Sequence, residues 1–64
     1  MYNVYTNNKF KKFADIDCAL NFARGEVYID IGNQEAKAKL IEKGYIDFLY
    51  GFHHVLIELE RINA

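Results

Sequence analysis

Residues Tyr45–Ile62, YIDFLYGFHHVLIELERI, decide the architecture, because a helical and a strand periodicity coincide in them. As two strands, YIDFLY and VLIELE form a hairpin that turns near Gly51–His54 and is rich in β-branched and aromatic residues. Gly44 and Gly51 also disfavour a helix, each by about 1 kcal/mol relative to Ala. The helical stripe nevertheless continues for about twenty residues, which favours a long C-terminal helix bent near Gly44, with the β-hairpin as the alternative. The residues of that stripe are Ile41, Tyr45, Phe48, Phe52, Val55, Leu59 and Ile62.

The stretch before it, Asp15–Ile31, predicts a helix followed by a strand. Asp15 is a good N-cap, since its carboxylate can accept hydrogen bonds from amides of the first turn. Gly25 is well placed as a left-handed residue that ends the helix, which is therefore expected over residues 13–25. The apolar side of this helix comprises Ile16, Ala19, Leu20 and Ala23. Val27, Ile29 and Ile31 then alternate with polar residues, which predicts a strand over Glu26–Ile31.

The remaining segments complete a small α+β domain. Tyr2–Thr6 and Lys9–Phe13 are expected to form a hairpin that turns at Asn7-Asn8. Asn33 is a candidate N-cap for a second helix that ends at Gly44. We therefore expect one compact domain over residues 1–64. Its fold is a small antiparallel sheet of about three strands in β-β-α-β order, with helices on one face.

The composition limits the class of protein. The 64 residues carry a net charge of −1, and 52% of them are hydrophobic, including five Tyr and five Phe. One cysteine excludes an internal disulfide framework and is typical of a reducing compartment. No secretory leader and no apolar run of the roughly 20 residues needed to cross a bilayer is found. These features predict a cytoplasmic protein without membrane association.

The apolar content favours a protein that associates with another chain. A domain of this size buries only about 60% of the surface that its unfolded chain exposes. Part of the apolar surface is therefore expected to be covered by a second copy or by another protein. We predict a small non-enzymatic protein-binding module, a homodimer, that acts through the apolar stripe of its C-terminal segment. The interface residues predicted are Tyr45, Phe48, Phe52, Val55 and Leu59.

A basic and aromatic segment near the N-terminus suggests nucleic acid as the alternative partner. Lys9, Lys11 and Lys12 are interleaved with Phe10 in a region that lacks acidic residues, a pattern typical of single-strand binders. Three lysines can neutralise only a few phosphates. The same lysines also suit an edge strand that must avoid pairing with other chains.

Residues that could carry chemistry are few. Cys18 lies near a helix start, where aligned amides lower the pKa of a thiol, but no base is placed beside it by spacing. His53 and His54 are adjacent and point in different directions, although His54 and Glu58 would share a face of a helix. Two ligands are too few for a structural zinc site. We therefore expect no catalytic residue, no metal and no cofactor.

Overall fold

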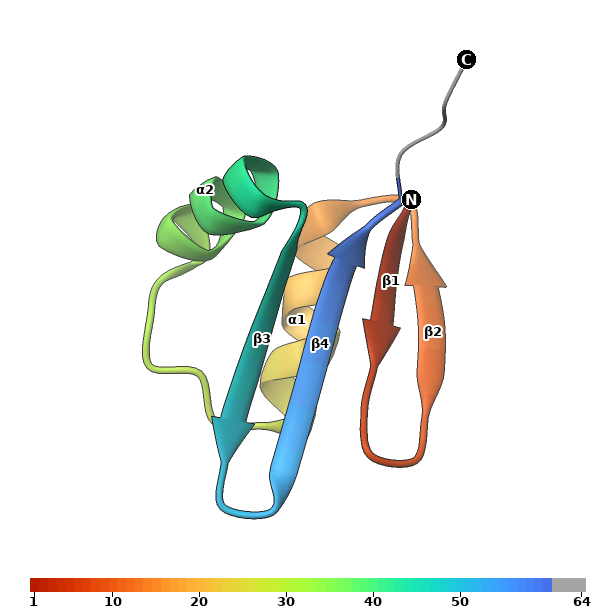
Figure 1. Cartoon of the computed structure of the whole chain (residues 1–64), viewed down its shortest axis with the longest axis vertical. Helices are drawn as coiled ribbons and strands as arrows, with labels where there is room; N and C mark the ends of the chain where they lie inside the picture. The colour runs from red at the N-terminus through yellow and green to blue at the C-terminus, as the bar shows by residue number, and fades with distance from the viewer. Residues whose placement is uncertain (61–64) are drawn as a thin grey trace.

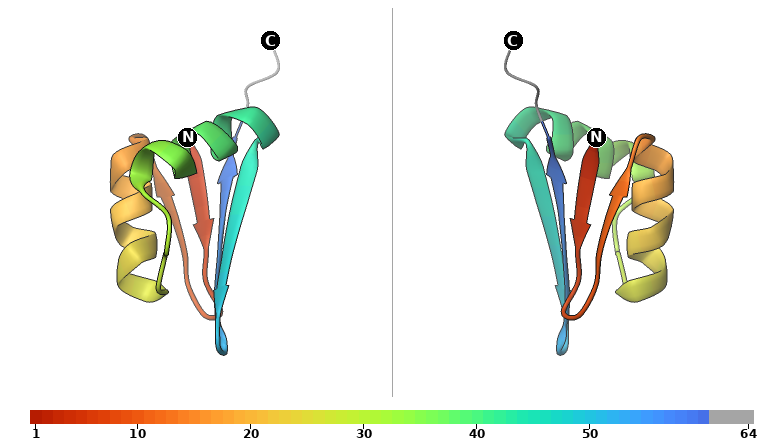
Figure 2. Two further views of the ribbon diagram at one scale, coloured as in Figure 1. Left: turned by 90° about the vertical axis from the view of Figure 1, so that its left-hand side faces the viewer. Right: turned by 90° about the vertical axis from the view of Figure 1, so that its right-hand side faces the viewer.

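The computed structural model of the protein describes residues 1–60, which form a four-stranded antiparallel sheet with two helices and so confirm the α+β class. The sheet order is β2-β1-β4-β3, so that the first and last strands are neighbours in its centre. α1 lies along one face of the sheet, and α2 crosses near the end at which β3 begins (Figures 1 and 2). The elements in chain order are β1 (Tyr2–Tyr5), β2 (Phe10–Phe13), α1 (Ile16–Glu26), α2 (Asn33–Lys43), β3 (Tyr45–Tyr50) and β4 (His53–Leu59).

The predicted long C-terminal helix is wrong, because residues 45–59 form the β3–β4 hairpin. Its two-residue turn has Gly51 at a φ of +64° in the first central position, and Phe52 has a negative φ. This is the φ pattern of a type II′ turn, whose twist matches that of the two strands. The hairpin buries Ile46, Phe48, Val55 and Ile57 at a period of two, so the spacing of four and three arose from residues on different faces. Residues 61 and 62 of the predicted helix lie outside the described residues.

The predicted strand over Glu26–Ile31 is also wrong, and the order is β-β-α-α-β-β instead of β-β-α-β. Glu26 belongs to α1, and residues 27–32 are irregular. The alternation is nevertheless reflected in burial, since Val27 and Ile29 lie in the core whereas Tyr28 and Asp30 are exposed. A period of two reports which side chains face the core, and it does not by itself provide a neighbouring strand.

Arg24 holds this irregular segment in place. Its guanidinium donates hydrogen bonds to the carbonyl oxygen of Ile31 at 2.6 Å and to that of Ile29 at 3.4 Å, and its Nε donates to Asn33 Oδ1 at 2.9 Å. Two carbonyl groups that a sheet would need are thus directed at the end of α1.

The ends of the helices follow the predicted chemistry in part. The Asp15 carboxylate accepts from the backbone N–H of Asp17 at 2.9 Å, as predicted, and the buried stripe of α1 includes Ala19, Leu20 and Ala23. Gly25 is an ordinary helical residue, since α1 continues to Glu26. The N-cap of α2 is Gly32 and not Asn33, whereas Gly44 adopts the predicted left-handed conformation, with a φ of +83°.

The N-terminal hairpin confirms the predicted pairing of the first two strands around Asn7-Asn8. Thr6 closes the turn twice, because its N–H donates to the carbonyl oxygen of Lys9 at 2.8 Å and its hydroxyl accepts from the N–H of Lys9 at 2.9 Å. Asn7 also donates from its side chain to the carbonyl oxygen of Phe52 at 2.6 Å, which joins the two hairpin turns.

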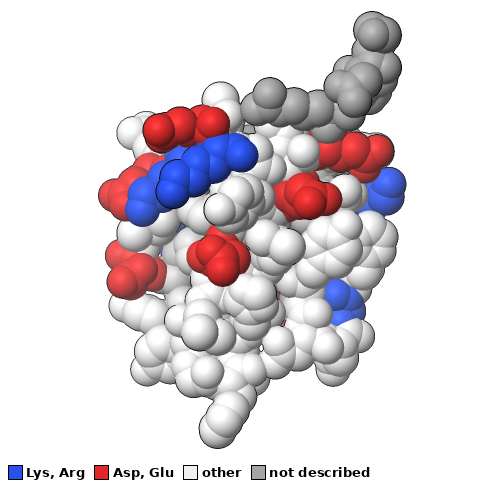
Figure 3. Space-filling view, in the orientation of Figure 1, with Lys and Arg blue, Asp and Glu red and all other residues white. Residues whose placement is uncertain are grey.

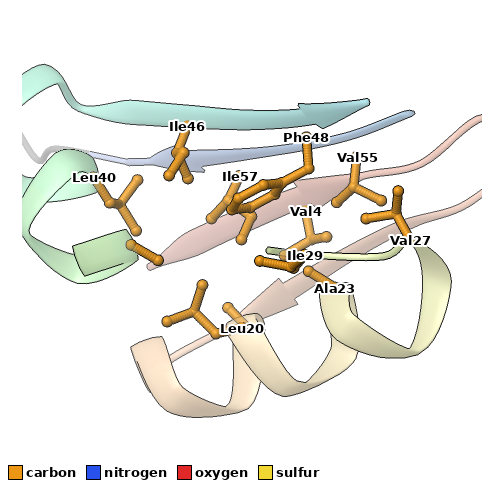
Figure 4. Packing of buried hydrophobic residues seen from close by; sticks show 12 residues of the cluster. Val4, Leu20, Ala23, Val27, Ile29, Leu40, Ile46, Phe48, Val55 and Ile57 are labelled. Carbon is orange, nitrogen blue, oxygen red and sulfur yellow. The ribbon is translucent and has the colours of Figure 1, made fainter. Parts of the chain in front are cut away.

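The core lies between the sheet and the helices (Figure 4). Burying an aliphatic side chain contributes about 1.5–3 kcal/mol, so the side chains of this core supply most of the favourable energy of the fold. Val27 and Ile29 of the irregular segment point into the same cluster. The largest fully buried side chains are Val4, Leu20, Leu40, Val55 and Ile57.

Candidate protein-binding surface

The face of the sheet turned away from α1 is not covered by either helix, and we call it the open face (Figures 1 and 2). Its members follow from the strand register, since side chains alternate between the two faces of each strand. They are Asn3, Tyr5, Phe10, Lys12, Tyr45, Asp47, Leu49, His54, Leu56 and Glu58.

The half of the open face toward the β3–β4 turn is mainly apolar, and Asp47 and His54 lie in it beside Leu56 and Leu49. Tyr5 pairs with Phe10 of β2 on one side and with Leu56 of β4 on the other. The rings of Tyr5 and Phe10 are 4.8 Å apart between centroids, and Leu49 is 72% exposed. Phe52 extends this region at the tip of the β3–β4 hairpin, where it is 96% exposed. Figure 3 shows that the lower part of the face, toward this tip, carries few charged side chains.

Charged groups lie toward the other end of the face and around it (Figure 3). Lys12 is 3.2 Å from the Glu60 carboxylate, and these two groups lie beside the start of β1. This hydrogen bond, with a second one from the side chain of Asn3, holds the pKa of Glu60 below its usual range. His54 Nε2 is 3.4 Å from Asp47 Oδ2 across the β3–β4 pair. An apolar area with a polar rim is typical of a surface that binds another protein.

Of the five interface residues predicted from the sequence, two lie at the surface and three lie in the core or pack against it. Tyr45 lies on the open face and Phe52 at the hairpin tip, and both are exposed. Phe48 and Val55 are core residues, 9% and 1% exposed, and Leu59 packs against the same core from β4. The stripe was drawn for a helix, and a strand sends its members alternately to opposite faces.

Four residues of the apolar half lay outside the predicted interface: Tyr5, Phe10, Leu49 and Leu56. Of these, Phe10 was predicted only as a nucleic-acid contact. Leu49 and Leu56 belong to the C-terminal segment, and a hairpin interpretation of it would have placed both on the face opposite Phe48 and Val55. Tyr5 could not be assigned from the sequence, because its position beside Leu56 depends on a pairing between segments about fifty residues apart.

The lysines of the nucleic-acid alternative point in different directions. Lys9 is 3.0 Å from Glu26, and Lys12 is paired with Glu60. Lys11 lies on the other face, 5.4 Å from the centre of the Phe22 ring of α1. Only Lys12 and Phe10 therefore share the open face, and a continuous basic track is not formed.

The residues considered for chemistry do not come together. Cys18 is exposed on α1, whereas His53 and His54 are on β4. His54 and Glu58 are on a strand, where residues four apart are separated by about 13 Å, so they do not share the helix face that the helical interpretation would give them. Within residues 1–60, no group of three or more His, Cys, Asp or Glu could hold a metal ion.

Within the same range, neither helix is long and apolar enough to cross a membrane. Comparison of the chain with protein-family models, with curated proteins and with solved structures finds no match.

Proposed function

We propose that this protein is a small, non-enzymatic protein-binding module and that it self-associates through the open face of its sheet. The observation that carries the proposal is the apolar half of this face, formed by Tyr5, Phe10, Leu49 and Leu56 next to the exposed Phe52. Monomeric soluble proteins rarely leave a large contiguous apolar area in water, and such areas with polar surroundings mark interaction sites.

The geometry suits a second copy of the chain. Two sheets can pack face to face about 10 Å apart, with their strands rotated by about 30°. A two-fold axis through the apolar half would bring Tyr5 and Leu56 of one copy against the same residues of the other, because a two-fold interface is self-complementary. Lys12 and Glu58 both pair with Asn3 near the start of β1, and Glu60 contacts Lys12, so these charged groups would stay in water.

The test is to place a charge in the middle of the open face. Leu56→Lys is expected to shift the dimer to the monomer, since a desolvated ammonium costs several kcal/mol. Ile41→Lys is the control, because Ile41 is an exposed aliphatic residue that lies on α2 and not on the open face, whereas Leu56 is half-buried. Phe52→Asp, at the fully exposed tip, should also weaken association without affecting the core.

Sedimentation at micromolar concentration measures the outcome. The unaltered chain and Ile41→Lys should have twice the monomer mass of 7.5 kDa, and Leu56→Lys should have the monomer mass. Circular dichroism confirms that each variant is folded. A monomeric unaltered chain, or a Leu56→Lys variant that remains dimeric, would exclude self-association through this face.

Binding of nucleic acid stays the alternative prediction, with Lys9, Lys11, Lys12 and Phe10 as its residues. It has less support, because ion pairs engage Lys9 and Lys12 and the open face carries the carboxylates of Asp47 and Glu58. Binding to single-stranded oligonucleotides that weakens steeply with added salt would favour it over a protein partner.

A further inference from the structure

The outer edge of β3 offers a row of backbone hydrogen-bonding groups. The N–H of Leu59 donates to the carbonyl oxygen of Gly44 at 2.8 Å, which identifies these two residues as a hydrogen-bonded pair of the β3–β4 ladder. Such pairs alternate along an antiparallel ladder, so Ile46, Phe48 and Tyr50 direct their N–H and C=O groups toward β4. The N–H and C=O groups of Tyr45, Asp47 and Leu49 therefore point away from the sheet. No backbone hydrogen bond within residues 1–60 joins them to the irregular segment.

A groove runs along this edge. It consists of two adjoining hollows of about 290 and 280 Å³, and both are lined by Asp30, Asp47 and Phe48. β3 forms one wall, and residues 28–31 form the other. Arg24 fixes this second wall through its hydrogen bonds to the carbonyl oxygens of Ile29 and Ile31. The groove thus lies between two fixed walls, one of which carries free backbone groups.

The two edges of the sheet differ in how they resist pairing. Lys11 and Lys12 belong to β2, which has four residues, and lysines on a short edge strand discourage other strands from adding to it. β3 has six residues, YIDFLY, of which only Asp47 is charged. Four of its residues, Tyr45, Ile46, Phe48 and Tyr50, are of types that favour strands. The β3 edge is therefore the one that is open to strand addition.

We propose that the groove beside β3 binds an extended peptide segment of another protein, which adds to the sheet as a fifth strand. The occupant is a single extended segment, because the groove is bounded by β3 on one side and by residues 28–31 on the other. Main-chain hydrogen bonds give such a complex its affinity, and the groove walls give it specificity. This site adjoins the open face, with which it shares Tyr45, Asp47 and Leu49, and it extends the proposed function to the edge of the sheet.

The charges along the groove define the chemistry of the peptide. Lys39 and Lys43 of α2 line the end near Tyr45, and Lys43 has no ion-pair partner within residues 1–60. Asp30 and Asp47 line the middle, and the rings of Tyr28 and Tyr50, 5.3 Å apart, lie at the other end. An antiparallel peptide places its C-terminus near the lysines. It should therefore carry acidic residues at its C-terminal end, a basic residue in the middle and an aromatic residue near its N-terminus.

The probe is a fluorescein-labelled peptide, Thr-Tyr-Val-Lys-Val-Glu-Glu, with a free C-terminus, titrated with the full chain and followed by fluorescence anisotropy. Two further peptides carry N-methyl groups on alternate amides. In one peptide the methylated amides are those that would face β3, and in the other they are those that would face away from it. Strand addition predicts that one set weakens binding at least about tenfold, since each lost hydrogen bond contributes about 0.5–1.5 kcal/mol, and that the other set changes it little. Equal effects of the two sets would overturn the proposal, as would no binding at about 1 mM peptide.

Variants of the chain test the same groups from the other side. Asp47→Pro removes an N–H that points away from β4, so the hairpin keeps its ladder, and it should weaken peptide binding relative to Asp47→Ala, which keeps the N–H. Lys43→Glu should weaken binding of this peptide. It should not weaken binding of a peptide that lacks the two Glu residues. If Asp47→Pro instead dissociates a dimer that Leu56→Lys leaves intact, the edge pairs with a second copy and the peptide proposal is wrong. If Leu56→Lys is monomeric but still binds the peptide, the open face and the groove beside β3 act independently.

Discussion

Arg24 is the residue on which the irregular segment most depends. It directs three hydrogen bonds from the last turn of α1 to Ile29, Ile31 and Asn33, and so links α1, the segment and the start of α2. The burial of Val27 and Ile29 depends on the same link, because these side chains reach the core from a stretch without a neighbouring strand.

We predict that Arg24→Met lowers the free energy of unfolding by about 1–2 kcal/mol, because it leaves the carbonyl groups of Ile29 and Ile31 without their charged donor while keeping the aliphatic stem. Urea denaturation measures the change. Lys43→Met is the control, since it removes a cation without an ion-pair partner in residues 1–60 and should change stability by less than about 0.5 kcal/mol. Equal effects of the two variants would show that Arg24 acts only through its charge.

Glu60 gives a pH-dependent signature of the contact between β2 and the end of β4. The hydrogen bond from Lys12 is the main cause of its lowered pKa, so Lys12→Met should raise that pKa toward its ordinary value. A carboxyl whose pKa is lower in the folded chain adds stability above its unfolded pKa and loses it as the pH falls through the folded value. Titration of the side-chain carboxyl carbon by NMR reads the pKa directly. Lys11→Met, on the other face, should leave it unchanged.

At the level of the elements, the glycines at the ends of the two helices differ in conformation. Gly25 is helical, whereas Gly44 is left-handed. Gly25→Ala is expected to stabilise the protein by about 0.5–1 kcal/mol, because the residue is helical and an added methyl group meets open space. Gly44→Ala is expected to destabilise it by about 1–2 kcal/mol, because its left-handed φ of +83° is strained for a side chain even where there is room. Thermal unfolding of both variants compares them. Changes of the same sign would contradict the assignment of the two helix ends.

Local signals predicted those elements whose causes are local. The Asp15 cap, the Gly44 stop and the first hairpin each depend on residues a few positions apart, and all three are confirmed. The C-terminal hairpin also had a local signal, since glycine followed by another residue suits a two-residue turn. That signal was outweighed by a helical stripe whose members, such as Phe48 and Phe52, belong to different surfaces of the protein.

At the level of the whole molecule, both candidate surfaces depend on pairings that no short stretch of sequence specifies. The open face takes residues from all four strands, and the groove takes its walls from β3 and the segment before α2. Tyr45 and Phe52 are exposed, but the helical stripe from which they were predicted does not exist in the structure. The groove could not be predicted, because it exists only where Arg24 keeps residues 28–31 from joining the sheet.

The central position of β1 has a consequence for how the chain folds during synthesis. Val4 faces Ile57 across the middle of the sheet, so the first strand receives its inner neighbour only when almost the whole described chain has left the ribosome. A two-stranded hairpin alone is marginally stable in water. The β1–β2 hairpin and α1 must therefore wait for β4, and the closure of so long a loop slows folding relative to proteins with mainly local contacts. The complete sheet can therefore form only after β4 has been made.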